Sequence, residues 1–507
     1  MSDKLIIRNT KRLILAGFAA LLIVSSCQRE EWDNYYKGPE TSNEKMWDIV
    51  KQNPNFSKFV ELMHENSLDT IFDKEQSFTL FIPNNASFDS FNLGNLTMDK
   101  VLGYHILKTV FIPSNINGSR KLQTFFNKYV LVEKIENEYY FNGNLISNPS
   151  SLYKDGMYYE LQVVATPKPT LFEYMDFYVP VFKHYIEGQD SIGFNPFLSL
   201  PIGFDDEGNT VYDSVFTSVN LFERDYFPVS IESRDNFATF ILFTQEQYNQ
   251  ALDEMALNLG SMFTDRNDIP QAWQSEVLMP YFIKYGVFRD PLQYSDLNKP
   301  SLRNIREEDV KINIANIDPE SRFICSNGVV FNYRNLVVPP ELYQETMRLE
   351  GEDLVTVPVG SENYAWKDDV IASDYSKTPT VLTSADASEG SYLTVELPRN
   401  SSVLYSLSFS FKNVFPSRYQ FIYRARSRPS GVIKFYVNDV LLGSIDNSKF
   451  NKSVDGNPSV GEFNSKAFFV ENHTEYGDVK IKVEYTGPGL LSNNGVCIDY
   501  IGLTPVK

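Results

Sequence analysis

Residues 79–88 read Thr79-Leu80-Phe81-Ile82-Pro83-Asn84-Asn85-Ala86-Ser87-Phe88. The run at 78–82 is rich in strand formers, and Pro83 stops it because proline has no backbone N–H to donate to a sheet. The asparagine pair that follows opens the next helical turn. Upstream, apolar residues from Met46 to Met63 recur at three- and four-residue steps. This spacing predicts helices that precede the strand.

Two further motifs follow in order: Leu102-Gly103-Tyr104-His105-Ile106-Leu107, then Asn142-Gly143 with the strand Leu161-Gln162-Val163-Val164-Ala165. Together with residues 79–88 they resemble the signatures of fasciclin-type (FAS1) domains, over residues 44–170. The resemblance implies an α+β fold and a structural role for its motif residues, which are Thr79, Phe81, Pro83, Asn84, Tyr104 and His105. A ligand or catalytic role for His105 is the alternative. Residues 145–158 interrupt the closing segment, so we expect a longer hairpin or loop there.

A second, fainter copy appears through internal repetition. Residues 239–248 repeat the pattern of 79–88, and residues 280–284 match 103–107 with Phe282 in place of the histidine. A closing strand is expected at 327–331. We predict a divergent fasciclin-like domain over 171–347, with a turn-rich insertion at about 195–225. Such an insertion either carries a binding function or is a tolerated surface loop.

From Val355 onward the apolar period becomes two, which predicts many half-buried antiparallel strands. Residues 355–507 resemble galactose-binding-like jelly rolls of the carbohydrate-binding-module kind. The resemblance implies a ligand in the edge loops or on a concave face, with Trp366, Tyr375 and Tyr392 as candidate contacts, and it allows a structural calcium ion. The predicted fold class is therefore two α+β fasciclin-like domains followed by an all-β jelly-roll sandwich.

The first 31 residues predict where the chain is placed. Four Lys and Arg side chains precede a twelve-residue apolar run from Leu13 to Val24, which matches a signal peptide over 1–26 and is too short to span a membrane. The Val-Ser-Ser-Cys ending resembles a bacterial lipoprotein box, which implies lipids on Cys27 and a tether over 27–43. The residues after it, Gln28, Arg29, Glu30 and Glu31, look like the surface-export signal of Bacteroidota lipoproteins, or are an ordinary solvated linker. We expect a lipid-anchored outer-membrane protein that faces the extracellular side.

Composition disfavours several classes of function. The net charge is −19, and removing residues 1–26, with four basic side chains and one acidic, leaves about −22, which disfavours nucleic-acid binding. The four histidines show no ligand spacing, and Cys325 and Cys497 are too few for a disulfide framework, so neither a metal site nor a cofactor is predicted. The acidic runs at 205–207 and 307–309 leave a glycosidase as a minor alternative, because such an enzyme needs two paired carboxyl groups.

We therefore predict a non-catalytic surface lipoprotein. By resemblance it is an accessory subunit of a SusC/SusD-type uptake complex, in which a TonB-dependent β-barrel and a SusD-like lipoprotein are its partners. The ligand is a glycan or a peptide, and tethering beside the partner raises the effective concentration of a weak site. The alternatives are a surface adhesin and a structural subunit of another outer-membrane barrel complex.

Overall fold

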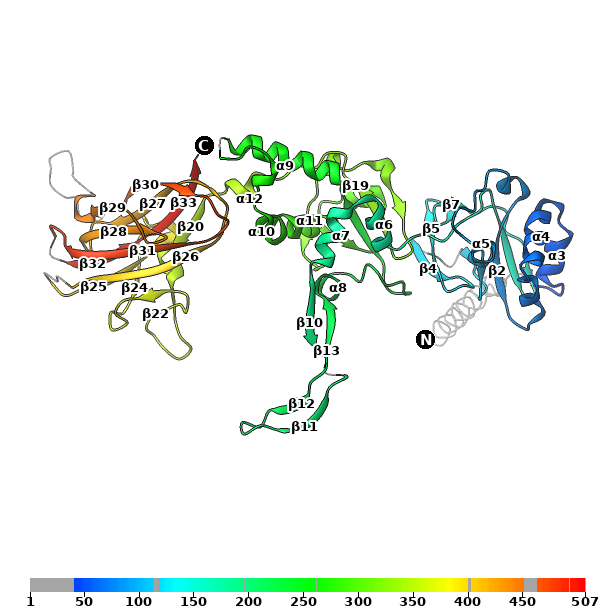
Figure 1. The fold of residues 1–507 in the computed structure, drawn as a ribbon, viewed down its shortest axis with the longest axis horizontal. Coiled ribbons are helices and arrows are strands. Elements are labelled where there is room, and N and C mark those ends of the chain that lie inside the picture. The colour runs from blue at the N-terminus through cyan, green and yellow to red at the C-terminus, as the bar shows by residue number, and fades with distance from the viewer. Residues whose placement is uncertain are drawn as a thin grey trace, which may run out of the picture.

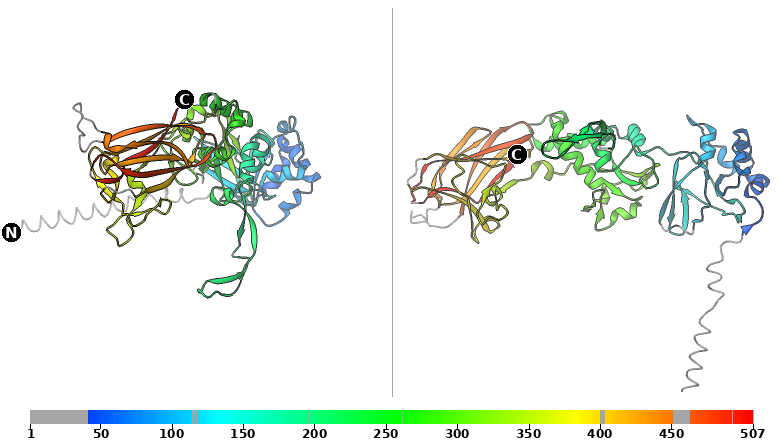
Figure 2. Two further views of the ribbon diagram at one scale, coloured as in Figure 1. Left: turned by 60° about the vertical axis from the view of Figure 1, so that its left-hand side comes forward. Right: turned by 90° about the horizontal axis from the view of Figure 1, so that it is seen from below.

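Three units follow one another along the long axis of the computed structural model (Figures 1 and 2). The structure describes residues 41–113, 116, 118–195, 197–260, 262–399, 403–450, 463–491 and 493–506. The predicted signal peptide, Cys27, the export signal and nearly all of the tether lie outside these residues. Among the described residues, none of the helices has the length and apolar character needed to cross a membrane.

The first unit is built on strand β2 (Phe78–Pro83), which is buried along its whole length. It runs parallel to β9 (Gly156–Leu161) and antiparallel to β3 (Ile106–Leu107). The closing strand therefore ends at Leu161, where the sequence predicted it to begin. The other elements are α3 (Met46–Gln52), α4 (Ser57–Glu65), α5 (Met98–Tyr104), β1 (Thr41–Ser42), β4 (Ser119–Gln123), β5 (Tyr129–Ile135), β6 (Glu138–Phe141), β7 (Asn144–Leu145) and β8 (Leu152–Tyr153).

The second unit repeats this central arrangement. Strand β14 (Ala238–Leu242) runs parallel to β19 (Gly328–Asn332) and antiparallel to β15 (Val287–Arg289). The helices are α6 (Leu171–Tyr178), α7 (Pro180–Glu187), α8 (Leu221–Asp225), α9 (Gln245–Leu259), α10 (Gln271–Trp273), α11 (Met279–Gly286) and α12 (Glu341–Gln344), and the remaining core strands are β16 (Leu302–Arg303), β17 (Asp309–Val310) and β18 (Phe323–Ile324). The predicted second α+β unit is present.

The strand register shows which residues of the two units are equivalent. Thr79 pairs with Leu107 in the first unit, and Thr239 pairs with Phe288 in the second. Each threonine hydroxyl donates to a carbonyl two residues past its partner, at 2.8 and 2.7 Å. His105 lies two residues before Leu107, and Gly286 lies two residues before Phe288. Gly286 therefore occupies the position in the second unit that His105 occupies in the first.

The predicted replacement of His105 by Phe282 is therefore wrong by four residues. Phe282 and Gly286 are one turn apart on α11, and apolar residues recur at that spacing on the helix. A sequence alignment on a helix can be shifted by one turn and still match apolar residues with apolar residues. The hydrogen-bonded register of the paired strands does not allow this shift. The second unit thus has glycine, and no side chain, where the first has a buried histidine.

The predicted insertion forms an arm that projects from the second unit (Figure 1). It consists of two antiparallel ribbons in series. The proximal ribbon pairs β10 (Asp190–Phe194) with β13 (Phe216–Asn220), and the distal ribbon pairs β11 (Leu200–Phe204) with β12 (Thr210–Asp213). We call residues 190–220 the β-arm.

The third unit is an all-β sandwich, as predicted. Tyr405, Leu407, Phe409 and Phe411 point into its core, which confirms the period-two pattern. Its strands are β20 (Met347–Glu350), β21 (Val355–Thr356), β22 (Ala365–Trp366), β23 (Ile371–Ala372), β24 (Thr380–Thr383), β25 (Ser391–Leu397), β26 (Tyr405–Val414), β27 (Ser417–Arg426), β28 (Gly431–Val437), β29 (Val440–Asp446), β30 (Phe463–His473), β31 (Gly477–Pro488), β32 (Asn494–Ile498) and β33 (Tyr500–Val506).

The sandwich begins earlier than the predicted residue 355. Strand β20 pairs with β33, so residues 347–350 already belong to the sheet. Their charges are accommodated at the sheet edge, where Arg348 Nε lies 2.5 Å from Glu350 Oε1. Cys325 and Cys497 are buried free thiols in different units.

The first and second units meet at a joint centred on β5. Leu131 packs into an apolar cluster of the second unit that includes Phe288 and Leu297. Beside it, the buried Glu133 carboxylate accepts hydrogen bonds from Arg322 at 2.6 Å and from Gln293 at 2.8 Å. The joint therefore combines apolar packing with a largely buried ion pair.

Candidate interaction surface

The β-arm is anchored at its base by a single asparagine. Asn220 donates to the carbonyl of Ile186 at 2.6 Å and to the Asp190 carboxylate at 2.8 Å, while its own oxygen accepts from the backbone N–H of Glu223 at 2.9 Å. These bonds tie the proximal ribbon to the end of α7 and cap α8. The arm consequently leaves the second unit in a defined direction.

The elbow between the two ribbons is also hydrogen-bonded. The Asn195 side chain accepts from the backbone N–H groups of Phe197 and Leu198, at 3.0 and 3.1 Å. The buried Ser199 hydroxyl donates to the Asn195 carbonyl at 2.6 Å and accepts from the Val215 N–H at 2.9 Å. The elbow is therefore a turn held by hydrogen bonds and not an extended linker.

The tip of the arm is acidic. Asp205 accepts hydrogen bonds from the backbone of Glu207 and Asn209, at 3.0 and 2.7 Å, and these bonds help to hold its pKa below the ordinary value. The arm carries Asp190, Asp205, Asp206, Glu207 and Asp213, but its sequence contains no Lys or Arg. Its charge is therefore negative throughout the neutral range.

Large apolar side chains of the arm face solvent. Phe197 is 96% exposed, Ile192 is 78% exposed and Phe204 is 76% exposed. The exposed apolar set of the arm is Ile192, Phe194, Phe197, Leu198, Leu200, Ile202, Phe204, Val211, Tyr212, Val215 and Phe216. An isolated two-stranded ribbon is marginally stable in water, and a continuous exposed apolar surface is typical of an interaction site.

The fasciclin motif residues lie inside the first unit. His105 is fully buried: its Nδ1 donates to the Phe81 carbonyl at 2.7 Å and its Nε2 accepts from the Ala165 N–H at 3.2 Å. Burial lowers the pKa of this imidazole to about 4, so the ring is neutral at pH 7. Tyr104 is buried as well and accepts a hydrogen bond from Asn142.

The stretch at 79–88 is positioned by its own side chains. The Thr79 hydroxyl donates to the Thr109 carbonyl and accepts from the Phe111 N–H, both at 2.8 Å. Pro83 ends β2, and the Asn84 side chain then accepts from the Ser87 N–H at 3.1 Å. This arrangement fits a structural role for the motif, which stays a prediction.

The three aromatic candidates of the sandwich are not gathered at one surface. Tyr392 is 3% exposed and its hydroxyl accepts from Arg426 at 2.6 Å, which argues against direct ligand contact. Trp366 lies on β22 opposite Val355 and is half-buried. Tyr375 is 65% exposed. Of the three, Tyr375 presents the most free ring surface, and the assignment of a ligand to them stays a prediction.

The acidic runs do not form a general-acid site. Glu308 bonds to Asn304 and pairs with Lys284, and both contacts lower its pKa, whereas a catalytic acid needs a raised one. The run at 205–207 lies at the exposed tip of the arm. Among the described residues, no three His, Cys, Asp or Glu side chains are grouped so as to hold a metal ion.

Comparison with known families supports the first part of the fold assignment. Residues 54–167 match the family model of the fasciclin domain. The first unit is therefore similar to a fasciclin domain. The predicted fold class, α+β units followed by an all-β sandwich, is confirmed. None of the curated proteins matches this chain.

Three solved structures illustrate the similarities. A FAS1 domain pair from the insect cell adhesion molecule fasciclin I is 12% identical, covers 57% of this chain and 99% of its own, and has a TM-score of 0.23. A family 35 carbohydrate binding module from Clostridium thermocellum is 14% identical, covers 32% and 98%, and has a TM-score of 0.20. A Paenibacillus xanthan lyase is 22% identical over 26% of this chain, with a TM-score of 0.21, and the chain spans only 12% of its length.

The exposed side chains of the arm were missed as functional candidates. The turn residues Pro, Gly and Asp favoured a loop, yet apolar residues alternate at Leu200, Ile202 and Phe204, which is a strand signal. The fasciclin domain itself points to an adhesion or binding role.

Proposed function

We propose that this chain is a non-catalytic, lipid-anchored accessory subunit at the outer-membrane surface, and that the β-arm docks it on a partner protein. The observation that carries the proposal is the arm: an anchored ribbon on which Ile192, Phe197 and Phe204 are each more than three-quarters exposed. Burying one such side chain stabilises a complex by about 1.5–3 kcal/mol. A few of them are enough for specific docking.

Charge favours one kind of occupant for the arm. Its five acidic residues would face five more in a second copy of the chain, and they would be repelled by an anionic lipid surface. A partner with an apolar cleft rimmed by Lys and Arg satisfies both the apolar surface and the charge. We therefore propose another protein as the occupant.

The proposal includes the anchor and the partner complex. Lipids on Cys27, with the export signal at Gln28, Arg29, Glu30 and Glu31, place the chain on the outer face of the membrane. There the partner is a TonB-dependent β-barrel of the SusC kind with its SusD-like lipoprotein, and the cargo is a glycan or a peptide. A calcium ion in the sandwich remains part of the proposal as a structural ligand only.

A surface adhesin is the second candidate, because the fasciclin match at residues 54–167 suggests adhesion as well as binding. An adhesin contacts its target with the exposed chain and needs no stable membrane partner. The two functions therefore differ in which proteins co-purify with the chain when it is extracted from the membrane.

Purification of the tagged full-length chain from native membranes in mild detergent tests the proposal. We expect a large β-barrel and a lipoprotein to accompany the wild-type chain, and Cys27→Ala to release the chain from the membrane fraction and lose both. Recovery of the wild-type chain alone, together with binding of the purified chain to cells or matrix, would support the adhesin instead.

A further inference from the structure

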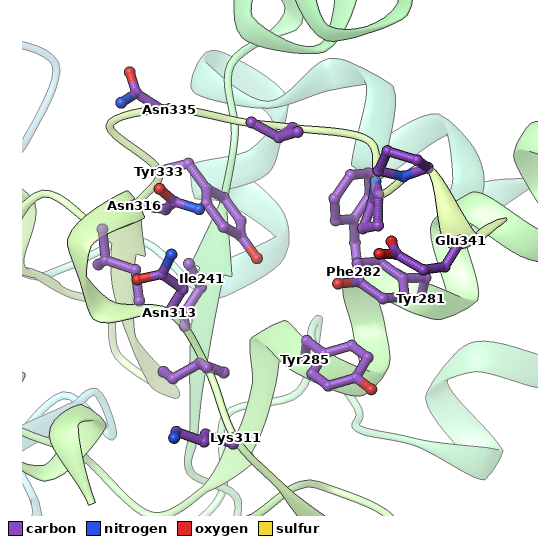
Figure 3. Close-up of a pocket in the computed structure, with 15 residues that line it drawn as sticks. Ile241, Tyr281, Phe282, Tyr285, Lys311, Asn313, Asn316, Tyr333, Asn335 and Glu341 are labelled. Carbon is purple, nitrogen blue, oxygen red and sulfur yellow. The ribbon is translucent and has the colours of Figure 1, made fainter. Parts of the chain in front are cut away.

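The second unit contains a cavity of about 230 Å³ (Figure 3). One side is formed by aromatic residues of α11, and the other by the segments around residues 311–317 and 333–341. The lining includes Ile241, Tyr281, Phe282, Tyr285, Asn313 and Asn316, together with Tyr333, Asn335 and Val337. The site is separate from the β-arm and does not depend on the function proposed for it.

One lining residue can be compared directly with the first unit. The parallel strand registers align Phe81 of the first unit with Ile241 of the second, and Ile241 lines the cavity. An isoleucine side chain fills less volume than a phenylalanine, so the second unit has more free space at this position than the first.

The lining combines aromatic faces with an amide that has no hydrogen-bond partner. The rings of Tyr281 and Tyr285 lie 4.6 Å apart at an angle of 43°. Opposite them, the Tyr333 hydroxyl points into the cavity (Figure 3). Within the described part of the chain, the side-chain amide of Asn316 makes no hydrogen bond to protein, so it is free to bind a ligand.

The size and charge of the cavity restrict its ligand. Its volume is below the roughly 300–1,000 Å³ that is usual for drug-sized ligands, so it admits about one ring. Lys311 and Glu341 contribute one charge of each sign, which favours a neutral ligand. A pyranose has an apolar C–H face that packs on aromatic rings and hydroxyls that bond to amides and phenols. We infer that this cavity binds one neutral pyranose unit of a glycan.

The test is saturation-transfer NMR on the full mature chain with methyl pyranosides of glucose, galactose, mannose and xylose. We expect at least one probe to receive saturation on its C–H face. Ile241→Phe restores the side chain of the first unit and should remove the signal. Asn316→Ala removes a lining amide that makes no hydrogen bond within the described chain, and it should weaken binding by about 2- to 10-fold, the effect of losing one hydrogen bond.

Asn298→Ala is the matched control, since Asn298 is an exposed asparagine of the same unit outside the cavity. It should leave the signal unchanged. The inference is overturned if no probe receives saturation, or if the signal persists equally in Ile241→Phe and Asn316→Ala. Persistence in both would place sugar binding elsewhere on the chain, such as the sandwich. Neither result bears on the docking function of the β-arm, which is tested separately by co-purification of the partner protein.

Discussion

Replacing Phe197, Leu200 and Phe204 with serine is expected to abolish capture of the partner protein while leaving the chain folded. All three side chains are exposed in the free chain, so their removal costs little packing. In the proposed complex each is buried and contributes about 1.5–3 kcal/mol. Even partial burial of the set makes capture more than about 100-fold weaker. The measurement is the amount of co-purified partner per tagged chain.

A second triple variant separates the effect of the arm from a general loss of surface hydrophobicity. Leu257, Val359 and Leu490 are aliphatic residues outside the arm that are about as exposed as the three arm residues. Their replacement with serine should leave partner capture within about twofold of wild type, and both triple variants should unfold at the wild-type temperature. If the arm variant retains the partner as well as the control does, the arm is not the docking surface.

Replacing Arg322 with methionine is expected to open the joint between the first two units. Glu133 is 1% exposed and takes its positive partner from the other unit, so the variant leaves a buried carboxylate without a counter-charge. Breaking such a pair costs about 3–5 kcal/mol. The joint is small enough that this loss should separate the units before either of them unfolds. Small-angle scattering should detect a larger and more variable radius of gyration, and limited proteolysis should cut near residues 165–170.

Two further variants make the Arg322 result interpretable. Arg334→Met removes an arginine of the same unit whose pairing with Asp318, at 3.9 Å, is exposed, and it should have almost no effect. Adding Glu133→Leu to Arg322→Met removes the stranded charge and should recover most of the lost rigidity, because apolar pairs often replace buried ion pairs without loss. An Arg322→Met chain with wild-type scattering would mean that the remaining contacts hold the joint, namely the apolar packing of Leu131 and the bonds of Lys121 and Lys128 to the second unit.

The sequence predicted the first unit well because its key residues act locally. The strand at 78–82, the stop at Pro83 and the turn after Asn84 depend on neighbours within a few positions. The position of the closing strand does not depend on near neighbours. Residues Gly156–Leu161 form that strand because they pair with β2, which lies 78 residues earlier in the sequence. The resemblance to the closing segment of fasciclin-type domains favoured the later run at 161–165.

The second unit shows where sequence matching fails. Apolar periodicity on α11 made Phe282 look equivalent to His105, whereas the strand register assigns that position to Gly286. Likewise, alternation predicted the sandwich strands but did not indicate that Tyr392 points into the core.

The function of the β-arm could not be predicted from composition. Its Pro, Gly and Asp residues are typical of a surface loop, and its apolar residues are typical of a strand within a core. What distinguishes it is that no layer of the described part of the chain covers the ribbon, which only the three-dimensional arrangement reveals (Figure 2).

Photo-crosslinking in living cells tests the central claim most directly. A benzophenone amino acid is introduced at Phe204 on the arm or at Leu257 on α9, both of which are exposed. We predict a discrete adduct from residue 204 that contains an outer-membrane β-barrel or its partner lipoprotein, and no such adduct from residue 257. An arm that gives no adduct, or that links only to a second copy of this chain, would contradict the proposed docking function.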